Sequence, residues 1–416
     1  MERCVEPSAI KGQVKAPASK SMTQRAIAAA LLADGQSIIS NPSYCDDSLA
    51  AMSIAIGLGA RVNPLPDELK ITASGELKEP KLNSGESGLA MRMFSPIAAL
   101  YPTEITMIGT NSLKKRPMFM IEEALNQLGA KCSSTDGFLP LTIKGPIIGG
   151  NCEIDGSISS QLLTGLLMAL PLASTDSEIK VNNLKSKPYI DMTIQVLKSF
   201  GITVHNSNYS LFKIPGNQKY ISQNYTVEGD WSGGAFLLVA GAISGQISIV
   251  GLRTDTKQSD IAIIKALEKA GAEMKIDENK IDISRSELKA FDFDATESPD
   301  LFPPLVTLAS YCHGISTIKG VSRLIFKESD RATALKEEFS KMDIGVEIKD
   351  DLMYITGGQP HGARVESHED HRIAMAVAIA ALGATDKVCI RDSQCVGKSY
   401  HGFFNDLRQL GAIVYE

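Results

Sequence analysis

The chain has 416 residues, of which 44% are hydrophobic and 22% charged, and its formal net charge at pH 7 is −6. This composition is typical of a soluble globular protein, and the length predicts two or three domains because one core stops growing near about 250–300 residues. The acidic balance and an aromatic fraction of 6% argue against a nucleic-acid groove. Seven scattered cysteines without a Cys-x-x-Cys pair predict free thiols in a reducing compartment. Residues 1–13 lack the apolar core of a signal peptide, so we expect a cytoplasmic protein.

One pattern occurs six times along the chain: an amphipathic helix ends at a small turn residue, and a β-rich segment follows. The copies are about 70 residues apart, which is too long for a solenoid repeat and predicts a whole α/β subdomain for each copy. The residue after the last helical turn often takes the left-handed conformation, which costs Gly nothing and which Asp tolerates. The six turn residues are Gly59, Gly129, Gly201, Gly271, Asp343 and Gly411.

A second helix, apolar on all sides, lies upstream of each turn. Such a helix must be buried all round, and none has the roughly 18 uninterrupted apolar residues of a membrane span. We therefore expect buried helices inside, with sheets and half-buried helices around them. An ordinary doubly wound fold is the alternative, but its helices should not alternate so regularly between fully and half buried. The six buried helices are expected at residues 21–33, 87–100, 160–173, 232–243, 301–311 and 371–382.

Positive charge occurs at the N-terminal ends of these apolar helices. Lys20 opens the first, Arg25 follows about one turn later, and Arg372 opens the sixth. A cation there opposes the helix dipole by typically about 0.3–1 kcal/mol, so it calls for an anion such as phosphate. Ser159 and Ser160 open the third helix, where simple N-capping is the favoured interpretation of either serine taken alone.

Further basic groups recur in most copies, which indicates one shared anionic site. They are Arg92, Lys114 to Arg116, Lys327, Arg331 and Lys398. Two acids are also candidates for the site. Asp300 precedes an apolar helix, and either N-caps that helix or acts as a base, while Glu328 lies between two cations and can exchange a proton. The six histidines have no metal-ligand spacing, so no metal is expected.

These motifs, in this order, resemble the 5-enolpyruvylshikimate-3-phosphate synthase family. The resemblance implies a two-domain, inside-out α/β (α+β) barrel in which each domain contains three βαβαββ repeats with buried helices. Residues 1–18 plus 229–416 would form one domain and 19–228 the other, with the active site in the cleft between them. The motifs are residues 17–21 with Arg25, 156–161, 186–191, 327–331, 370–375 and 398–399.

The family transfers the enolpyruvyl group of phosphoenolpyruvate to the 5-hydroxyl of shikimate 3-phosphate and releases phosphate, on the shikimate pathway to chorismate and the aromatic amino acids. The resemblance implies no cofactor, no nucleic acid, no membrane and a monomer. Asp300 would take the hydroxyl proton, and Glu328 with Lys20 would protonate the methylene carbon. By position, shikimate 3-phosphate would be bound by Lys20, Ser21, Arg25, Ser159, Ser160, Gln161, Ser186, Asp300, Arg323 and Lys327. Phosphoenolpyruvate would be bound by Lys20, Gly88, Arg116, Gln161, Arg331, Arg372 and Lys398.

Two departures from the family pattern concern the binding site. Where the family usually has Asn-Ala-Gly-Thr, residues 86–89 read Glu-Ser-Gly-Leu, and Met93 replaces a frequent Pro. These changes alter the wall beside phosphoenolpyruvate, so we expect altered sensitivity to glyphosate, the family's inhibitor at that site. An inhibition constant equal to that of a sensitive homologue would contradict this. Arg323 replaces an Asn that some members direct at the shikimate hydroxyls.

Three other functions compete with this interpretation. UDP-N-acetylglucosamine enolpyruvyl transferase shares the fold and the donor, but its loop normally carries a Cys five residues before the Arg-Pro pair, where this chain has Asn111. The motifs at Lys20 and Gln161 also favour the shikimate acceptor. An RNA-binding module should bind with steep salt dependence, which the acidic charge argues against. A structural scaffold would not need cations at helix N-termini.

Overall fold

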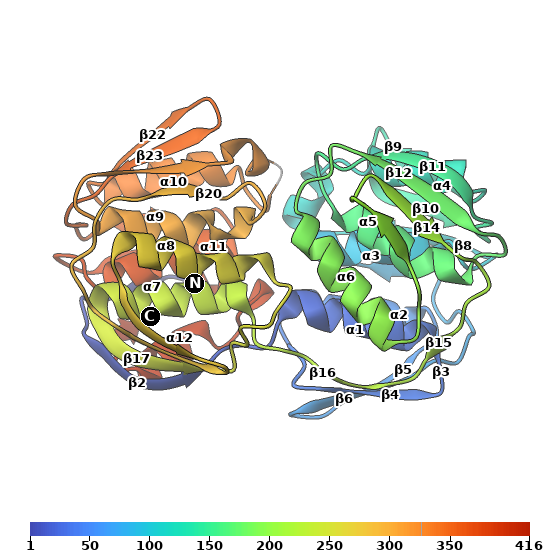
Figure 1. The fold of residues 1–416 in the computed structure, drawn as a ribbon, viewed down its shortest axis with the longest axis horizontal. Helices are drawn as coiled ribbons and strands as arrows, with labels where there is room; N and C mark the ends of the chain where they lie inside the picture. The colour runs from blue at the N-terminus through green and yellow to red at the C-terminus, as the bar shows by residue number, and fades with distance from the viewer. Residues whose placement is uncertain (326) are drawn as a thin grey trace. The chain divides into compact units, whose positions relative to one another are not determined.

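The computed structural model describes residues 1–325 and 327–416. Contacts within the chain divide it into two compact units, one of Met1–Pro17 with Glu228–Glu416 and the other of Ala18–Val227. Each division lies one residue from a boundary expected from the sequence. Figure 1 follows the chain through both units by colour. Across the described residues, no helix is long and apolar enough to cross a membrane.

The unit Ala18–Val227 contains three sheets with one topology. In each sheet the first strand is parallel to the second, and the third and fourth continue antiparallel. In the first sheet, the last strand of the unit pairs with a strand near the beginning of the unit. The two ends of the unit are therefore joined in one sheet. The strand orders are β16 (Asn224–Thr226), β4 (Gln36–Ser40), β6 (Glu68–Thr72), β5 (Arg61–Pro64); β7 (Lys81–Asn83), β8 (Glu104–Ile108), β10 (Phe138–Lys144), β9 (Lys131–Thr135); and β11 (Gly150–Asp155), β12 (Ser177–Asn182), β14 (Leu211–Ile214), β13 (His205–Ser207). A short parallel pair joins β15 (Tyr220–Ile221) to β3 (Ala33–Asp34).

The other unit repeats the same topology three times. Its N-terminal segment supplies two of the strands, which explains why residues from the start of the chain belong with the C-terminal half. The orders are β2 (Ile10–Lys15), β17 (Gly245–Val250), β19 (Lys280–Ser284), β18 (Glu273–Asp277); β20 (Asp292–Asp294), β21 (Ile315–Lys319), β23 (Leu352–Thr356), β22 (Gly345–Lys349); and β24 (Arg364–Glu366), β25 (Val388–Arg391), β1 (Arg3–Val5), β26 (Val414–Tyr415).

Two classes of helix alternate along the chain, as the hydrophobic pattern predicts. The first class is buried on nearly every side and forms the interior of each unit: α1 (Lys20–Leu32), α3 (Gly88–Ala98), α5 (Gln161–Ala169), α7 (Trp231–Ser244), α9 (Phe302–Ser310) and α11 (His371–Ala381). The second class buries one face: α2 (Asp46–Gly57), α4 (Phe119–Gln127), α6 (Lys187–Ser199), α8 (Ile263–Ala270), α10 (Arg331–Lys341) and α12 (Phe403–Gln409). The predicted alternation is confirmed. The expected helix at 160–173 ends early, in a 3-10 turn at Leu170–Leu172, because Pro171 has no N–H to continue it.

All six turn residues have the predicted left-handed backbone. Their φ angles are +105° at Gly59, +90° at Gly129, +80° at Gly201, +83° at Gly271, +63° at Asp343 and +101° at Gly411. At Gly59 the surroundings also exclude a side chain, since a Cβ would lie 2.2 Å from the carbonyl oxygen of Glu76. Glycine is therefore required there twice over, by conformation and by space.

The expectation of free thiols throughout is wrong for two of the seven cysteines. Cys4 of β1 and Cys389 of β25 face each other across an antiparallel pair and form a disulfide. Strand pairing brings together residues 385 positions apart, which no sequence spacing reveals. The other five cysteines are buried free thiols, and burial raises the pKa of Cys132, Cys152 and Cys312 to about 12.

Replacing Gly59 by Ala should destabilise the fold more than replacing Gly201 in the same unit. Both changes force a non-glycine residue into the left-handed region, at a cost of about 1–2 kcal/mol. At Gly201 the nearest atom is the end of the exposed Ile221 side chain, 2.9 Å away, which can rotate aside, whereas at Gly59 the obstacle is backbone. Thermal unfolding should show the larger drop in melting temperature for Gly59→Ala. Equal drops would show that the clash with Glu76 is relieved at no cost.

Candidate active site

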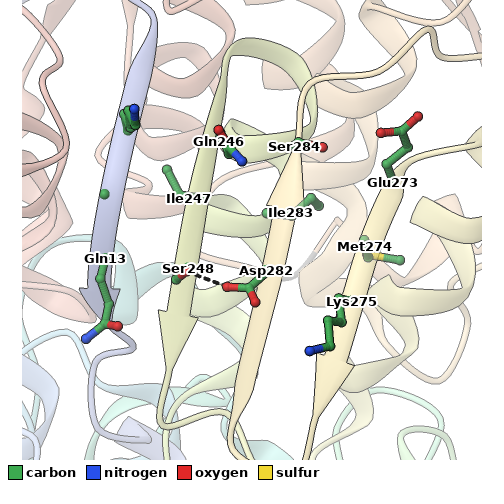
Figure 2. A pocket seen from close by; sticks show the side chains of 12 residues that line it. Gln13, Gln246, Ile247, Ser248, Glu273, Met274, Lys275, Asp282, Ile283 and Ser284 are labelled. Atoms are coloured by element: carbon green, nitrogen blue, oxygen red, sulfur yellow. Dashed lines mark hydrogen bonds between the residues drawn. The ribbon is translucent and has the colours of Figure 1, made fainter.

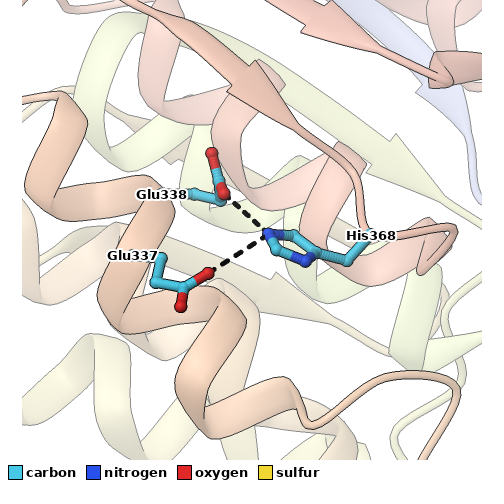
Figure 3. Close-up of side chains that lie close together, drawn as sticks. All are labelled: Glu337, Glu338 and His368. Carbon is cyan, nitrogen blue, oxygen red and sulfur yellow. Dashed lines mark hydrogen bonds and ion pairs between the residues drawn. The ribbon is translucent and has the colours of Figure 1, made fainter.

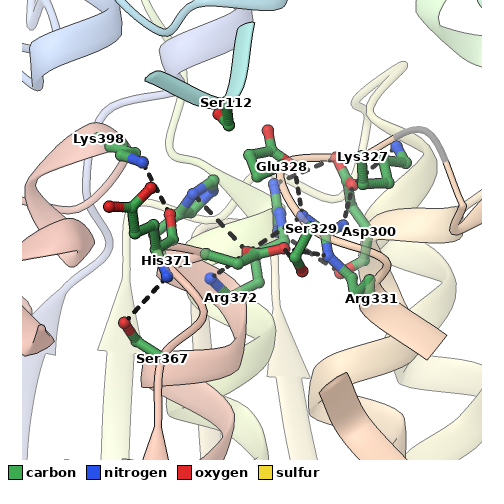
Figure 4. Close-up of polar contacts among 12 residues, drawn as sticks. Ser112, Asp300, Lys327, Glu328, Ser329, Arg331, Ser367, His371, Arg372 and Lys398 are labelled. Atoms are coloured by element: carbon green, nitrogen blue, oxygen red, sulfur yellow. Dashed lines mark hydrogen bonds and ion pairs between the residues drawn. The ribbon is translucent and has the colours of Figure 1, made fainter. Parts of the chain in front are cut away.

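Arg331, the first residue of α10, is the centre of a buried ionic cluster in the unit that contains the C-terminus. Its Nε lies 2.9 Å from Asp370 Oδ2, its Nη1 3.0 Å from Asp300 Oδ1, and its Nη2 2.6 Å from Glu328 Oε2 (Figure 4). The Arg331 side chain is fully buried. Burial acts to lower the pKa of this guanidinium, but the charges of Asp370, Glu328 and Asp300 raise it instead. One planar cation therefore holds three carboxylates in fixed positions.

Asp300 accepts hydrogen bonds from three cations. Lys327 Nζ lies 3.1 Å from its Oδ1 and Arg372 Nη2 lies 3.2 Å from its Oδ2, in addition to Arg331. Burial acts to raise the pKa of Asp300, but the charges of Arg372, Lys327 and Arg331 outweigh it and hold the pKa well below its usual range. The carboxylate is therefore ionised, and it gains proton affinity only when these cations find other partners.

Asp370 and Lys398 complete this group. Asp370 caps α11, because its Oδ1 accepts from the backbone N–H of Arg372 at 2.9 Å. Lys398 is buried and donates from Nζ to the carbonyl of Glu369 at 2.7 Å. The cations Lys327, Arg331 and Arg372 thus face three carboxylates, and the cluster is close to neutral. Arg323, which ends a 3-10 turn at Val321–Arg323, lies half-buried four residues before Lys327.

Asp260 is a further buried carboxyl that the sequence did not single out. It lies in the 3-10 turn Ser259–Ala262 and accepts from the hydroxyls of Ser232 and Ser259. Burial and the charge of Asp300 raise its pKa to about 6, although Arg372 acts in the opposite direction. No local motif marks Asp260, because several groups that act on it, such as Ser232 and Asp300, are distant in sequence.

In the unit Ala18–Val227, Lys20 and Arg25 lie on the first two turns of α1, whose N-cap is Ser19. Lys20 Nζ is 2.9 Å from Asp47 Oδ2, a partner on α2 that sequence reasoning missed. Arg25 is buried and donates only to neutral oxygens among its assigned hydrogen bonds, including Thr193 Oγ1 at 2.9 Å and the carbonyl of Ser21 at 2.9 Å. Desolvation lowers the pKa of Arg25 to about 10. A buried guanidinium held this way favours an anion nearby.

Gly88, Arg92, Arg116 and Gln161 form a second group in this unit. Arg92 Nη1 donates to Gln161 Oε1 at 2.9 Å, which fixes the first residue of α5. Gly88 opens α3 beside Arg116, since a Cβ at Gly88 would lie 2.5 Å from Arg116 Nη1. Arg116 itself is buried. The absent side chain at Gly88 is therefore what lets this guanidinium approach the helix N-terminus.

The serines have different roles. Ser159 Oγ accepts from the backbone N–H of Gln161 at 3.2 Å, so it provides the contact that was expected of a cap, while Ser160 makes no side-chain cap hydrogen bond. Ser186 has φ +57° at the N-cap of α6, an uncommon conformation for a residue with a side chain. Strained positions of this kind cluster at ligand sites.

The described residues contain a single group with the spacing of metal ligands: Glu337, Glu338 and His368. It lies on α10 and on the loop before α11 (Figure 3). The ionic cluster itself contains arginines and lysines where a metal site would have further oxygens or imidazoles. Its cations and carboxylates are groups that can bind anions and exchange protons.

The buried cations suit a protein that binds small anions, and comparison with known proteins identifies the family. Residues 5–407 match the family described as EPSP synthase (3-phosphoshikimate 1-carboxyvinyltransferase). A 3-phosphoshikimate 1-carboxyvinyltransferase of Clostridium perfringens (strain SM101 / Type A) is 38% identical over 418 residues, covering 99% of each chain. One from Thermococcus kodakarensis is 39% identical over 402 residues, covering 96% of this chain and 98% of that protein. The solved EPSP synthase of Acinetobacter baumannii has a TM-score of 0.84 at 26% identity, with all of both chains covered.

The chain belongs to the EPSP synthase family. The predicted fold class, a two-domain inside-out α/β architecture, is confirmed by the structural match. The predicted enzyme class is confirmed as well: the family's reaction is transfer of the enolpyruvyl group of phosphoenolpyruvate to shikimate 3-phosphate, in the shikimate pathway.

Replacing Asp260 by Asn should stabilise the protein at pH 8, and by roughly half as much at pH 5. A pKa raised from 3.8 to about 6 means that the stability contributed by this carboxyl is full below pH 3.8 and is lost as the pH rises through about 6. At pH 8 the loss is at most about 3 kcal/mol, and Asn, which resembles the protonated carboxyl, avoids it. Melting temperatures of both proteins at the two pH values measure this. A destabilised variant at pH 8 would show that Asp260 is needed as an anion.

Proposed function

We propose that this chain carries out the family's reaction itself, releasing phosphate from phosphoenolpyruvate and joining its enolpyruvyl group to the 5-hydroxyl of shikimate 3-phosphate. The observation that carries the proposal is the position of Asp300 among Lys327, Arg331 and Arg372. This arrangement offers a general base whose proton affinity rises when anionic substrates draw the cations away. The proposed ligands come from both units.

Shikimate 3-phosphate binds to the residues around Arg25. Arg25 supports this assignment because it is buried, holds its guanidinium against hydroxyl and carbonyl oxygens, and has a lowered pKa that a phosphate would restore. Lys20 adds a second cation at the N-terminus of the same helix. The proposed ligands are Lys20, Ser21, Arg25, Ser159, Ser160, Gln161, Ser186, Asp300, Arg323 and Lys327.

Phosphoenolpyruvate carries both a phosphate and a carboxylate, and so requires more cations. Arg116 beside Gly88 provides one planar guanidinium, and Arg372 at the start of α11 provides another. The proposed ligands are Lys20, Gly88, Arg116, Gln161, Arg331, Arg372 and Lys398.

The proposed chemistry uses only side chains. Asp300 takes the 5-hydroxyl proton as that oxygen bonds to the central carbon of phosphoenolpyruvate, and Glu328 with Lys20 delivers a proton to the methylene carbon, which becomes a methyl group. In the tetrahedral intermediate the methyl group then returns a proton to Glu328 with Lys20, Asp300 passes its proton to the departing phosphate oxygen, and the bond from the central carbon to that oxygen breaks. Phosphate leaves, and the enol double bond is restored. We place this enzyme in the cytoplasm as a monomer that acts on small molecules without nucleic acid or cofactor.

A direct assay tests the function. Phosphate release from phosphoenolpyruvate is measured with shikimate 3-phosphate and, separately, with UDP-N-acetylglucosamine. The proposal requires turnover with the first acceptor only. Turnover with the second acceptor alone would move the chain to the other enolpyruvyl transferases.

Replacing Lys20 by Met should reduce kcat by at least about 10²–10³-fold, the usual effect of losing one preorganised charged donor. The matched control is Lys180→Met, which removes an exposed lysine paired with Glu153 in the same unit. Steady-state phosphate release measures both variants. Near-normal turnover in Lys20→Met would remove Lys20 from the reaction.

Replacing Gly88 by Ala should raise the KM for phosphoenolpyruvate without unfolding the protein. The new Cβ would meet Arg116 Nη1 at 2.5 Å, so the flexible guanidinium must move, while Ala suits the first turn of α3 at least as well as Gly. We expect a KM increase of about tenfold, the size of one weakened charge-assisted hydrogen bond. An unchanged KM with an unchanged melting temperature would separate Arg116 from the phosphoenolpyruvate site.

A further inference from the structure

Helix α10 contacts the segment before α11 at two places, one near each end of the helix. At its first residue, Arg331 binds the carboxylate of Asp370. Seven residues later, on the same face, the buried carboxylate of Glu338 accepts from the backbone N–H of Glu366 at 2.9 Å and lies 2.6 Å from His368 Nε2 (Figure 3). Because a buried carboxylate can only accept, the imidazole donates to it. The segment 366–370 is thus attached to α10 at both of its ends.

Between these two attachments the backbone is strained. His368 and Glu369 have φ angles of +53° and +55°, so two consecutive residues with side chains take the left-handed conformation. A residue with a side chain adopts this conformation at an energetic cost, and it persists there only where the surroundings enforce it. Ser367 helps from one side, since its Oγ accepts from the N–H of Glu369 at 3.2 Å.

The strained turn directs one backbone carbonyl oxygen at Lys398, a residue proposed to bind phosphoenolpyruvate. The carbonyl of Glu369 accepts from Lys398 Nζ at 2.7 Å, and the next residue, Asp370, binds Arg331 and caps the helix that presents Arg372. A relaxed backbone at 368–369 would rotate this carbonyl away. Lys398 would then lose its hydrogen bond to this carbonyl, and the Asp370 cap that holds Arg372 at the start of α11 would be displaced.

From this geometry we infer that His368 and Glu338 are positioning residues for the phosphoenolpyruvate site, holding the turn at 368–369 so that the Glu369 carbonyl aims Lys398. The inference deepens the proposed function and rests on it, since that function places Lys398 at phosphoenolpyruvate. Neither residue touches substrate in this account. Their effect passes through the backbone of Glu369.

The alternative occupant of this corner is a metal ion, since ligand atoms of Glu337, Glu338 and His368 lie within 4.8 Å of one another. The carboxylate of Glu338, however, already accepts from Lys341 Nζ at 2.9 and 2.7 Å as well as from His368 and Glu366. Glu337 is exposed and 3.9 Å from the imidazole. A lysine within hydrogen-bond distance of both carboxylate oxygens favours a brace between side chains over a cation site.

The test compares three variants of the full chain. His368→Leu removes the donor, His368→Gln keeps one, and the matched control Lys341→Met removes the other side-chain partner of Glu338 without touching the turn. We expect His368→Leu to raise the KM for phosphoenolpyruvate about tenfold while the KM for shikimate 3-phosphate stays within about twofold. His368→Gln should recover most of the loss, and Lys341→Met should leave both KM values unchanged.

Other results would overturn the inference. An unchanged KM for phosphoenolpyruvate in an active His368→Leu enzyme would do so, as would the same change in Lys341→Met or an equal rise in both KM values. If the wild type releases no phosphate with shikimate 3-phosphate, the proposed function fails instead. Calorimetric affinity for phosphoenolpyruvate in the same variants still decides the role of His368, and melting temperatures separate local effects from unfolding.

Discussion

In the unit that contains the C-terminus, the geometry of the ionic cluster depends on one buried cation. The Arg331 side chain is fully inaccessible to solvent, and its guanidinium binds carboxylates from three separate parts of the chain. Removing one partner of a buried pair typically costs about 3–5 kcal/mol, so these carboxylates cannot drift independently. Asp370 in turn caps α11, and Asp300 faces Arg372 on that same helix. The arginine therefore positions the carboxylate of Asp300, helix α11 and Arg372 on that helix.

The two units differ in how they stabilise a buried guanidinium. Around Arg331, cations and carboxylates neutralise one another, so the site is stable without substrate and must exchange partners when substrate arrives. Around Arg25, the assigned partners are neutral oxygens, and the guanidinium has a lowered pKa. A phosphate bound at Arg25 would add a favourable interaction without displacing a carboxylate from that guanidinium. The arrangement around Arg25 therefore suits the binding of a phosphate, and the arrangement around Arg331 suits an exchange of ionic partners.

Features set by local chemistry could be predicted from the sequence. The turn at Gly59 and its five counterparts follows from the conformational freedom of Gly and Asp, and burial of α3 or α11 follows from apolar residues on every side. The sequence also singled out Lys20 and Arg372, because cations at helix N-termini are unusual. The early end of α5 at Pro171 could have been read from the same rules.

Features that depend on tertiary pairing were missed. Two of these features, the Cys4–Cys389 disulfide and the Lys20–Asp47 pair, join residues that are far apart in sequence. A third, the buried Asp260, lies in a stretch of sequence without a recognisable motif. Asp300 illustrates the ambiguity well. Its position before a helix suggested an N-cap as readily as a base, yet Ser298 and Leu301 occupy the cap positions there, and the carboxylate of Asp300 binds cations instead.

Exchange of ionic partners at Asp300 is the central claim, and a crystal structure with shikimate 3-phosphate and glyphosate tests it most directly. We expect Lys327 and Arg372 to leave the Asp300 carboxylate for oxygens of the two ligands, and Asp300 to accept from the 5-hydroxyl. If both ligands bind while Lys327 and Arg372 keep their present contacts with Asp300, the carboxylate cannot gain the proton affinity that a base needs, and the account is wrong.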